Sequence, residues 1–154
     1  MIHEISSQIL DIEIVQNLLN SDAKLALSES ATNKIVACRT YLDTRLEDQK
    51  TPIYGINTGF GSLCNVKISD EHLSKLQENL VTSHACGTGD RVPQEIVKLM
   101  LLLKVQSLSY GHSGIQLQTV QRLIDFYNHD ILPVVFEQGS LGASGDLAPL
   151  AHLS

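Results

Sequence analysis

The stretch from Pro93 to Leu108, PQEIVKLMLLLKVQSL, decides the fold class that we expect for this chain. Pro93 can open a helix here, and the apolar residues that follow cover almost its whole circumference. These apolar residues are Ile96, Val97, Leu99, Met100, Leu101, Leu102, Leu103, Val105 and Leu108. A helix that is apolar all round is buried on all sides, so we expect it to pack against further chain or another subunit.

Apolar residues at helical spacing, together with helix-end signals, predict more helices on both sides of this stretch. They span 9–19, 28–48, 69–84 and 116–128, and a last helix starts at 146 or just after it. Ser69 is the predicted N-cap of the third of them, and Gly87 favours an end near His84. A short strand is predicted at 53–56, and a loop or short strand at 133–136. The expected fold class is therefore mainly α, with a few short strands.

Bulk properties exclude two classes of partner. The formal net charge of -6 repels phosphate backbones, so nucleic acid is not an expected partner. The most hydrophobic stretch, 96–105, contains two lysines and is too short and too charged for a membrane span. Three cysteines without C-x-x-C spacing, and a first segment unlike a signal peptide, predict a cytoplasmic protein with reduced thiols.

The end of the chain, Gly139 to Ser154, reads GSLGASGDLAPLAHLS and places a serine among glycines before a predicted helix. A phosphate cradle is one interpretation, but the glycine spacing is not that of a P-loop and the loop has no lysine. A hydrolase nucleophile elbow is a second, but Asp146 replaces the last glycine of G-x-S-x-G. His152 also lies too near in sequence to be the usual triad histidine.

A third interpretation uses the backbone itself. If the chain bends tightly, the amide nitrogen of Gly145 can approach the carbonyl carbon of Ala143, because glycine has no Cβ in the way. Loss of the Ser144 hydroxyl as water then leaves an exocyclic methylidene, an electrophile that no unmodified side chain offers. A helix N-terminus beside it would make it more electron-withdrawing.

The same stretch resembles a signature of the histidine/phenylalanine ammonia-lyase family, whose Ala-Ser-Gly triplet cyclises to 4-methylidene-imidazol-5-one (MIO). Three more stretches resemble that family in the same order: YGINTGFG at 54–61, LQENLVTSHACG at 76–87 and LLLKVQSLSYGHSGI at 101–115. The likeness runs from about Pro52 to the end of the chain. It departs from the family pattern at His112 and Gln116, where the family has Phe and Arg.

The resemblance implies a role for several residues. MIO would form from Ala143, Ser144 and Gly145, with no external cofactor and no metal. Tyr54 corresponds to the base that removes the substrate β-proton. An ordinary phenol has a pKa near ~10, so this role needs positive surroundings or donated hydrogen bonds. Asp146 either polarises the triplet or caps the helix that follows.

Ser83 and His84 match the pair that sets substrate choice in the family, and Ser-His is similar to the histidine-specific members. An imidazole can exchange a hydrogen bond with a substrate imidazole, which leucine cannot. The alternative is a helix-end histidine bonded to a carbonyl. Gly61 and Leu147 correspond to pocket-lining positions, or are ordinary loop and core residues. The remaining histidines show no metal spacing and are expected at the surface or at helix ends: His3, His72, His112, His129 and His152.

The resemblance also implies an organisation. Residues 1–154 would be the N-terminal domain of an ammonia-lyase of fumarase/aspartase-like helical architecture, ending just after the MIO motif, with the C-terminal bundle absent. The whole protein would be a homotetramer that converts histidine to urocanate and ammonia, and the isolated chain would be inactive. The alternatives are a tyrosine or phenylalanine ammonia-lyase, or a non-catalytic helical module that associates with a longer partner.

Overall fold

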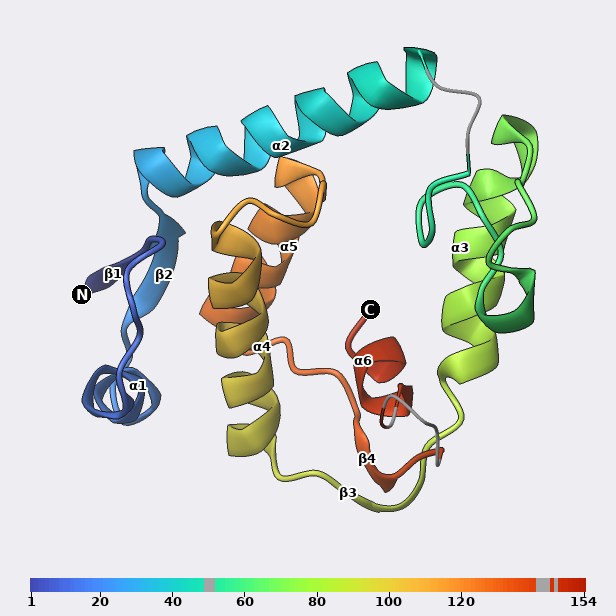
Figure 1. Ribbon diagram of the computed structural model, residues 1–154. Helices are drawn as coiled ribbons and strands as arrows, with labels where there is room; N and C mark the ends of the chain where they lie inside the picture. The colour runs from blue at the N-terminus through green and yellow to red at the C-terminus, as the bar shows by residue number, and fades with distance from the viewer. Residues whose placement is uncertain (49–51, 141–144, 146) are drawn as a thin grey trace. The chain divides into compact units, whose positions relative to one another are not determined.

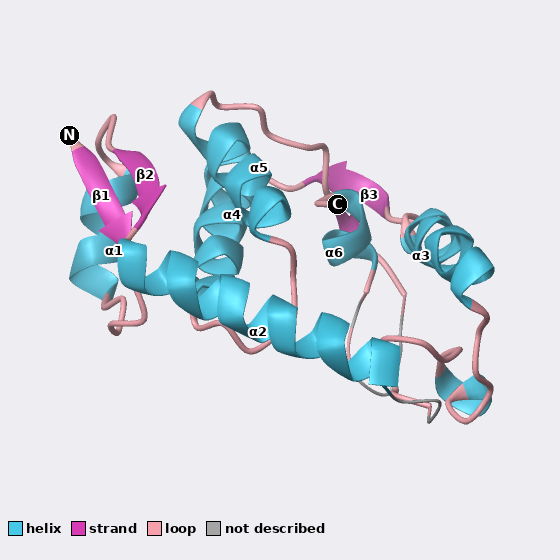
Figure 2. Cartoon of the chain, turned by 90° about the horizontal axis from the view of Figure 1, so that it is seen from above, coloured by secondary structure: helices cyan, strands magenta, loops and turns pink. Residues whose placement is uncertain are grey.

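The computed structural model describes residues 1–48, 52–140, 145 and 147–154. Helices are the predominant elements in both views, which confirms the predicted fold class (Figures 1 and 2). The chain divides into two compact units. Unit 1 comprises Met1–Glu47 and Val92–Pro133, and unit 2 comprises Asp48–Arg91 and Val134–Ser154. No helix in the described part of the chain is both long enough and apolar enough to cross a membrane.

Unit 1 combines a two-stranded parallel sheet with helices. Its elements are β1 (Ile2–Ile5), α1 (Ile12–Leu19), β2 (Lys24–Leu27), α2 (Glu29–Asp48), α4 (Gln94–Ser109) and α5 (Leu117–Asn128). The sequence predicted the first helix from residue 9, but it starts at Ile12 because the Asp11 carboxylate accepts from the Ile14 N–H over 2.8 Å. The other helices begin within one or two residues of their predicted starts.

The core of unit 1 lies where α4 packs on α5 and α5 on β2 (Figure 1). Its fully buried side chains include Ile5, Ile35, Val97, Leu101, Leu102, Val105, Val120 and Ile124. The side-chain amide of Asn128 pairs with the edge of β2: its oxygen accepts from the Leu25 N–H and its nitrogen donates to the Leu25 carbonyl, over 2.7 and 2.9 Å. That pairing satisfies backbone groups of β2 that a third strand would otherwise satisfy.

The described residues do not bury α4 on all sides, which agrees with the expectation that this helix packs against further chain or another subunit. Ile96 is 44% exposed and Leu103 is 48% exposed. They lie seven residues apart, two helical turns, and so share one side of the helix. The described elements that bury Leu101 and Leu102 cover the opposite side. The further chain or subunit expected over the exposed side stays a prediction.

Leu101→Ala should destabilise the protein by about 2–5 kcal/mol, because it opens a cavity beside α5 where the side chain is now fully buried. Leu103→Ala is the matched control on the same helix. Its side chain is 48% exposed, so we expect a loss below about 1 kcal/mol. Urea unfolding followed by circular dichroism measures both. Equal losses would contradict the one-sided burial of α4.

Unit 2 consists of η1 (Gly61–Leu63), α3 (Asp70–His84), β3 (Thr88–Arg91), β4 (Phe136–Gln138) and α6 (Ala148–His152). The strands β3 and β4 pair antiparallel, with Thr88 opposite Gln138 and Arg91 opposite Phe136. Helix α6 packs on α3 and on β4. Pro149 falls in its first turn, where the missing N–H costs nothing, as the sequence predicted. Unit 2 carries all the described residues to which the sequence assigned a role.

Candidate functional site

A tight loop in unit 2 carries Tyr54. The strand predicted at 53–56 is wrong, because residues 54–57 form a turn in which the Ile56 N–H donates to the Ile53 carbonyl over 3.1 Å. Gly55 has a φ of +76°, a left-handed value that reverses the chain and that a β-branched residue would not adopt. The Tyr54 side chain is 62% exposed at this turn.

Two buried polar residues hold this loop in shape. The side-chain oxygen of Asn57 accepts from the Ile53 N–H over 2.6 Å, and Asn57 is only 2% exposed. Thr58 is fully buried, and its backbone forms an isolated antiparallel β-bridge with Lys67. The Gly59 N–H donates to the Val66 carbonyl over 3.1 Å. These contacts join residues four, seven and nine apart in the chain, so the loop is closed upon itself and presents Tyr54 from a fixed base.

Phe60 and Gly61 continue the loop beside Tyr54. The Phe60 and Tyr54 rings meet edge to face, with centroids 5.9 Å apart and planes at 69°. Gly61 opens η1 with a φ of +57°, and a Cβ on it would meet nothing within 4 Å. Its backbone conformation, and not crowding, is therefore what requires glycine there.

The end of α3 fixes the orientation of His84. Its Nδ1 lies 2.8 Å from the Leu80 carbonyl oxygen, which can only accept, so Nδ1 carries the proton. The other ring nitrogen, Nε2, then carries the lone pair and can accept a hydrogen bond. The helix-end bond that the sequence offered as an alternative role for His84 is thus present, and it leaves Nε2 available to a ligand.

Ser83 lies beside the cavity without lining it. Its hydroxyl donates to the Leu80 carbonyl over 3.0 Å and lies 3.0 Å from His84 Nδ1. The Ser83 hydroxyl thus contacts both the ring nitrogen of His84 and the carbonyl to which that nitrogen is bonded. The structure therefore places the Ser83 hydroxyl against the His84 ring.

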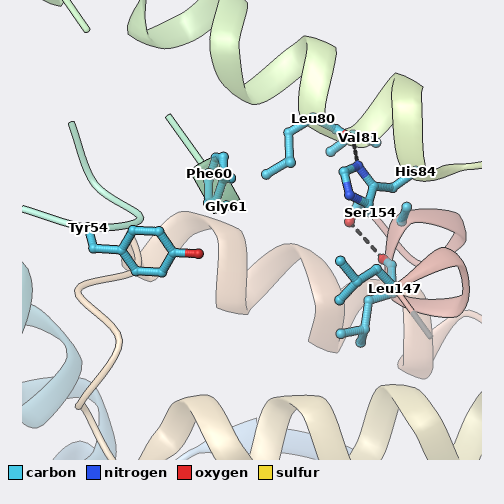
Figure 3. A pocket seen from close by; sticks show the side chains of 10 residues that line it. Tyr54, Phe60, Gly61, Leu80, Val81, His84, Leu147 and Ser154 are labelled. Carbon is cyan, nitrogen blue, oxygen red and sulfur yellow. Dashed lines mark hydrogen bonds between the residues drawn. The ribbon is translucent and has the colours of Figure 1, made fainter. Parts of the chain in front are cut away.

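A cavity of about 600 Å³ lies between these elements of unit 2. It is lined by Tyr54, Phe60, Gly61, Leu80, Val81, His84, Leu147, Leu150, Ala151 and Ser154. Figure 3 shows the Tyr54 hydroxyl and the His84 ring on opposite sides of it, with Leu147 near the His84 side. Most of the lining is apolar, which suits a small ring held by a few polar groups.

Four predicted site residues thus share this cavity: Tyr54, Gly61, His84 and Leu147. Leu80 and Val81 were not predicted, although they precede His84 by four and three residues and so share its helix face. That spacing could have identified them. Leu150, Ala151 and Ser154 were also missed, because only the packing of α6 on α3 brings them to the cavity.

The predicted MIO triplet falls partly outside the described residues, since Ala143 and Ser144 are not among them, and neither is Asp146. Gly145 is described and has a φ of +106°, a conformation that residues with a Cβ rarely adopt. The chain at Gly145 is therefore bent in a way that only glycine takes without strain. That observation fits a backbone-derived group, whose closure also requires a residue without Cβ at this position.

The Tyr54 hydroxyl has little around it that would make it a base. Among the described residues, none donates a hydrogen bond to it and no cation contacts its ring. No cluster of three or more His, Cys, Asp or Glu within the described ranges could hold a metal ion.

Comparison with known proteins places these features in a context. Residues 10–154 match the sequence model of a family described as aromatic amino acid lyase. The chain is 48% identical over 145 residues to a histidine ammonia-lyase of Deinococcus radiodurans, which covers 94% of this chain and 28% of that protein. A histidine ammonia-lyase of Legionella pneumophila (strain Corby) is 46% identical over the same shares.

Solved structures give the same picture. The histidine ammonia-lyase of Trypanosoma cruzi superimposes with a TM-score of 0.84 at 35% identity, over 99% of this chain and 28% of that one. The ergothionase of Treponema denticola superimposes with a TM-score of 0.90 at 26% identity, over 99% and 30%. The chain therefore spans less than a third of the length of the relatives that it matches.

Proposed function

The chain belongs to the aromatic amino acid lyase family, and on that premise we propose that the protein deaminates L-histidine to urocanate and ammonia. The observation that carries this choice of substrate is the His84 ring. Its Nδ1 is bonded to the Leu80 carbonyl, and its Nε2 is left as an acceptor in the wall of an apolar cavity. The names of the similar curated proteins support the same substrate.

The cavity suits an imidazole. A substrate imidazole N–H can donate to His84 Nε2, whereas a phenyl ring has no group that would satisfy this acceptor. Leu80, Val81 and Leu147 supply an apolar wall against which a flat ring can pack. Ser83 holds the His84 ring in this tautomer and orientation.

The reaction would need an electrophile, which a group derived from the backbone would supply, and a base, which a side chain of this chain would supply. MIO, formed from Ala143, Ser144 and Gly145, would supply an electrophile for the amino acid. Tyr54 would accept the substrate β-proton on its phenolate oxygen as the carbon–nitrogen bond breaks and the new carbon–carbon double bond forms. The loop bonds at Asn57 and Thr58 hold the Tyr54 backbone in place for that transfer.

We propose a cytoplasmic homotetramer for the whole protein. The family resemblance supports the assembly, and the free state of Cys38, Cys64 and Cys86 fits a reducing compartment. Because the polar surroundings that Tyr54 needs are missing from the described residues, the rest of the assembly would supply them. The chain on its own is then expected to be inactive.

A substrate panel of histidine, tyrosine and phenylalanine on the full-length protein and on His84→Leu tests the proposal. Wild type should act on histidine, and His84→Leu should lower its kcat/KM about 10- to 100-fold, because one hydrogen bond to the ring is lost. Thr82→Ala is the control, since its exposed hydroxyl bonds the Glu78 carbonyl away from the cavity. Wild type acting only on tyrosine would refute the assignment.

A further inference from the structure

His152 ends α6, and its imidazole contacts two other segments of unit 2. The Gly87 N–H donates to its Nε2 over 3.1 Å, and the Phe136 N–H lies 3.4 Å from its Nδ1. The Phe136 ring also meets the imidazole edge to face, with centroids 5.6 Å apart. One side chain therefore joins α6 to the first residue of β4 and to the residue before β3.

The bond to Gly87 is the stronger of the two polar contacts. A neutral imidazole has one nitrogen with a free lone pair, so it accepts from one N–H at a time. The shorter distance assigns that bond to Gly87 N and His152 Nε2. A side chain of similar length without an acceptor would leave the half-buried Gly87 N–H without this partner.

The absence of a side chain at Gly87 leaves room for the His152 ring. A Cβ at position 87 would lie 2.3 Å from His152 Cε1 and 3.1 Å from the Phe136 Cβ. Its φ is outside the left-handed region, so backbone freedom does not explain the glycine. Space for the His152 ring does.

The contact links the two walls of the cavity. Gly87 follows His84 by three residues, and His152 follows Leu147 by five. Helix α6 has five residues, which is too short to be stable by itself. Its apolar anchors, Ala148 and Leu153, are buried, but burial is not directional and leaves the helix free to shift along α3.

We propose that His152 is a positioning residue for the deamination proposed above, on which this inference rests. By accepting from Gly87 and packing on Phe136, it sets the spacing between the His84 wall and the Leu147 wall of the cavity. It touches no substrate itself. Its loss should therefore act mainly through substrate binding, raising KM more than it lowers kcat.

The test compares His152→Gln with His152→Met in the full-length protein. The two side chains have similar length, but only glutamine offers an acceptor near the position of Nε2. We expect His152→Met to lower kcat/KM for histidine about 5- to 100-fold, the range set by leaving the half-buried Gly87 donor unpaired, and His152→Gln to stay within about threefold. The rate of hydrogen–deuterium exchange in the peptide that contains Gly87 should rise by a similar factor in His152→Met, and it should not rise in His152→Gln.

Equal kinetic losses in the two variants, or none in either, would overturn the inference. If His152→Met does not fold, Gly87→Ala decides, because its Cβ displaces the same ring; wild-type kinetics in that variant would also overturn it. If the wild-type protein deaminates none of the three amino acids, the proposed function fails. The exchange measurement still stands then: faster exchange at Gly87 in His152→Met supports the contact, and unchanged exchange refutes it.

Discussion

Replacing Ser144 by alanine should abolish deamination, with a loss of at least about 10³-fold in kcat. The methylidene carbon of MIO would come from the Ser144 side chain, and its double bond forms only when the hydroxyl leaves as water. Alanine has the carbon but no leaving group, so no electrophile can form. The measurement is turnover of histidine together with the intact mass of the full-length protein. Wild type should be lighter than its sequence by two waters, one lost when the Gly145 nitrogen closes the ring on the Ala143 carbonyl and one lost with the Ser144 hydroxyl, and the variant should lack this two-water deficit.

Ser140→Ala is the matched control for Ser144→Ala. Both serines lie in the same glycine-containing stretch, and Ser140 is exposed and is not part of the triplet. Its variant should keep the mass deficit and stay within about threefold of wild-type turnover, as surface substitutions usually do. A Ser144→Ala protein that deaminates histidine at the wild-type rate would rule out the backbone-derived electrophile.

Tyr54→Phe should lower kcat by about 10²- to 10⁴-fold, the range that a general base contributes, and leave KM nearly unchanged. The substitution removes only the hydroxyl. It keeps the edge-to-face contact with Phe60 and leaves the Asn57 bond that closes the loop, so the fold should not change. Steady-state kinetics with histidine measure the effect, and circular dichroism checks the fold.

Tyr41→Phe is the control for Tyr54→Phe. Tyr41 is 65% exposed, close to the 62% of Tyr54, but it lies on α2 in unit 1. It should keep wild-type kinetics. Equal kinetics in the two variants would remove Tyr54 from the reaction and leave it as a loop residue that contacts Phe60.

The helices could be predicted because each carries its own signals. Apolar spacing located α3, the nearly continuous apolar run after Pro93 located α4, and Ser69 was correctly placed as the N-cap of α3. Even there the detail differs: the Ser69 hydroxyl bonds His72 Nδ1 and caps no backbone N–H. Which side of α4 is exposed could not be predicted from its composition, because that depends on which neighbours are present, and composition does not include them.

The candidate site was also predicted only in part from the sequence. The motifs that resemble the family predicted that Tyr54, Gly61, His84 and Leu147 belong to the site, and the structure brings all four to one cavity. No motif indicated that Ser83 faces the His84 ring and not the cavity, since a helix-end side chain can turn either way until the Leu80 carbonyl is placed.

From the sequence alone came the family, the helical class and the identity of most chemical groups, because residue type and local spacing are properties of short stretches. The structure decided the turn at Tyr54 and the tautomer of His84 through bonds to backbone groups three and four residues away. The tertiary structure decided the contact of His152 with Gly87, which lies 65 residues away in the chain. Each of these depends on a bond or a close approach whose partner is a backbone group. Backbone groups are the same in every residue, so only the folded path of the chain determines which of them meet.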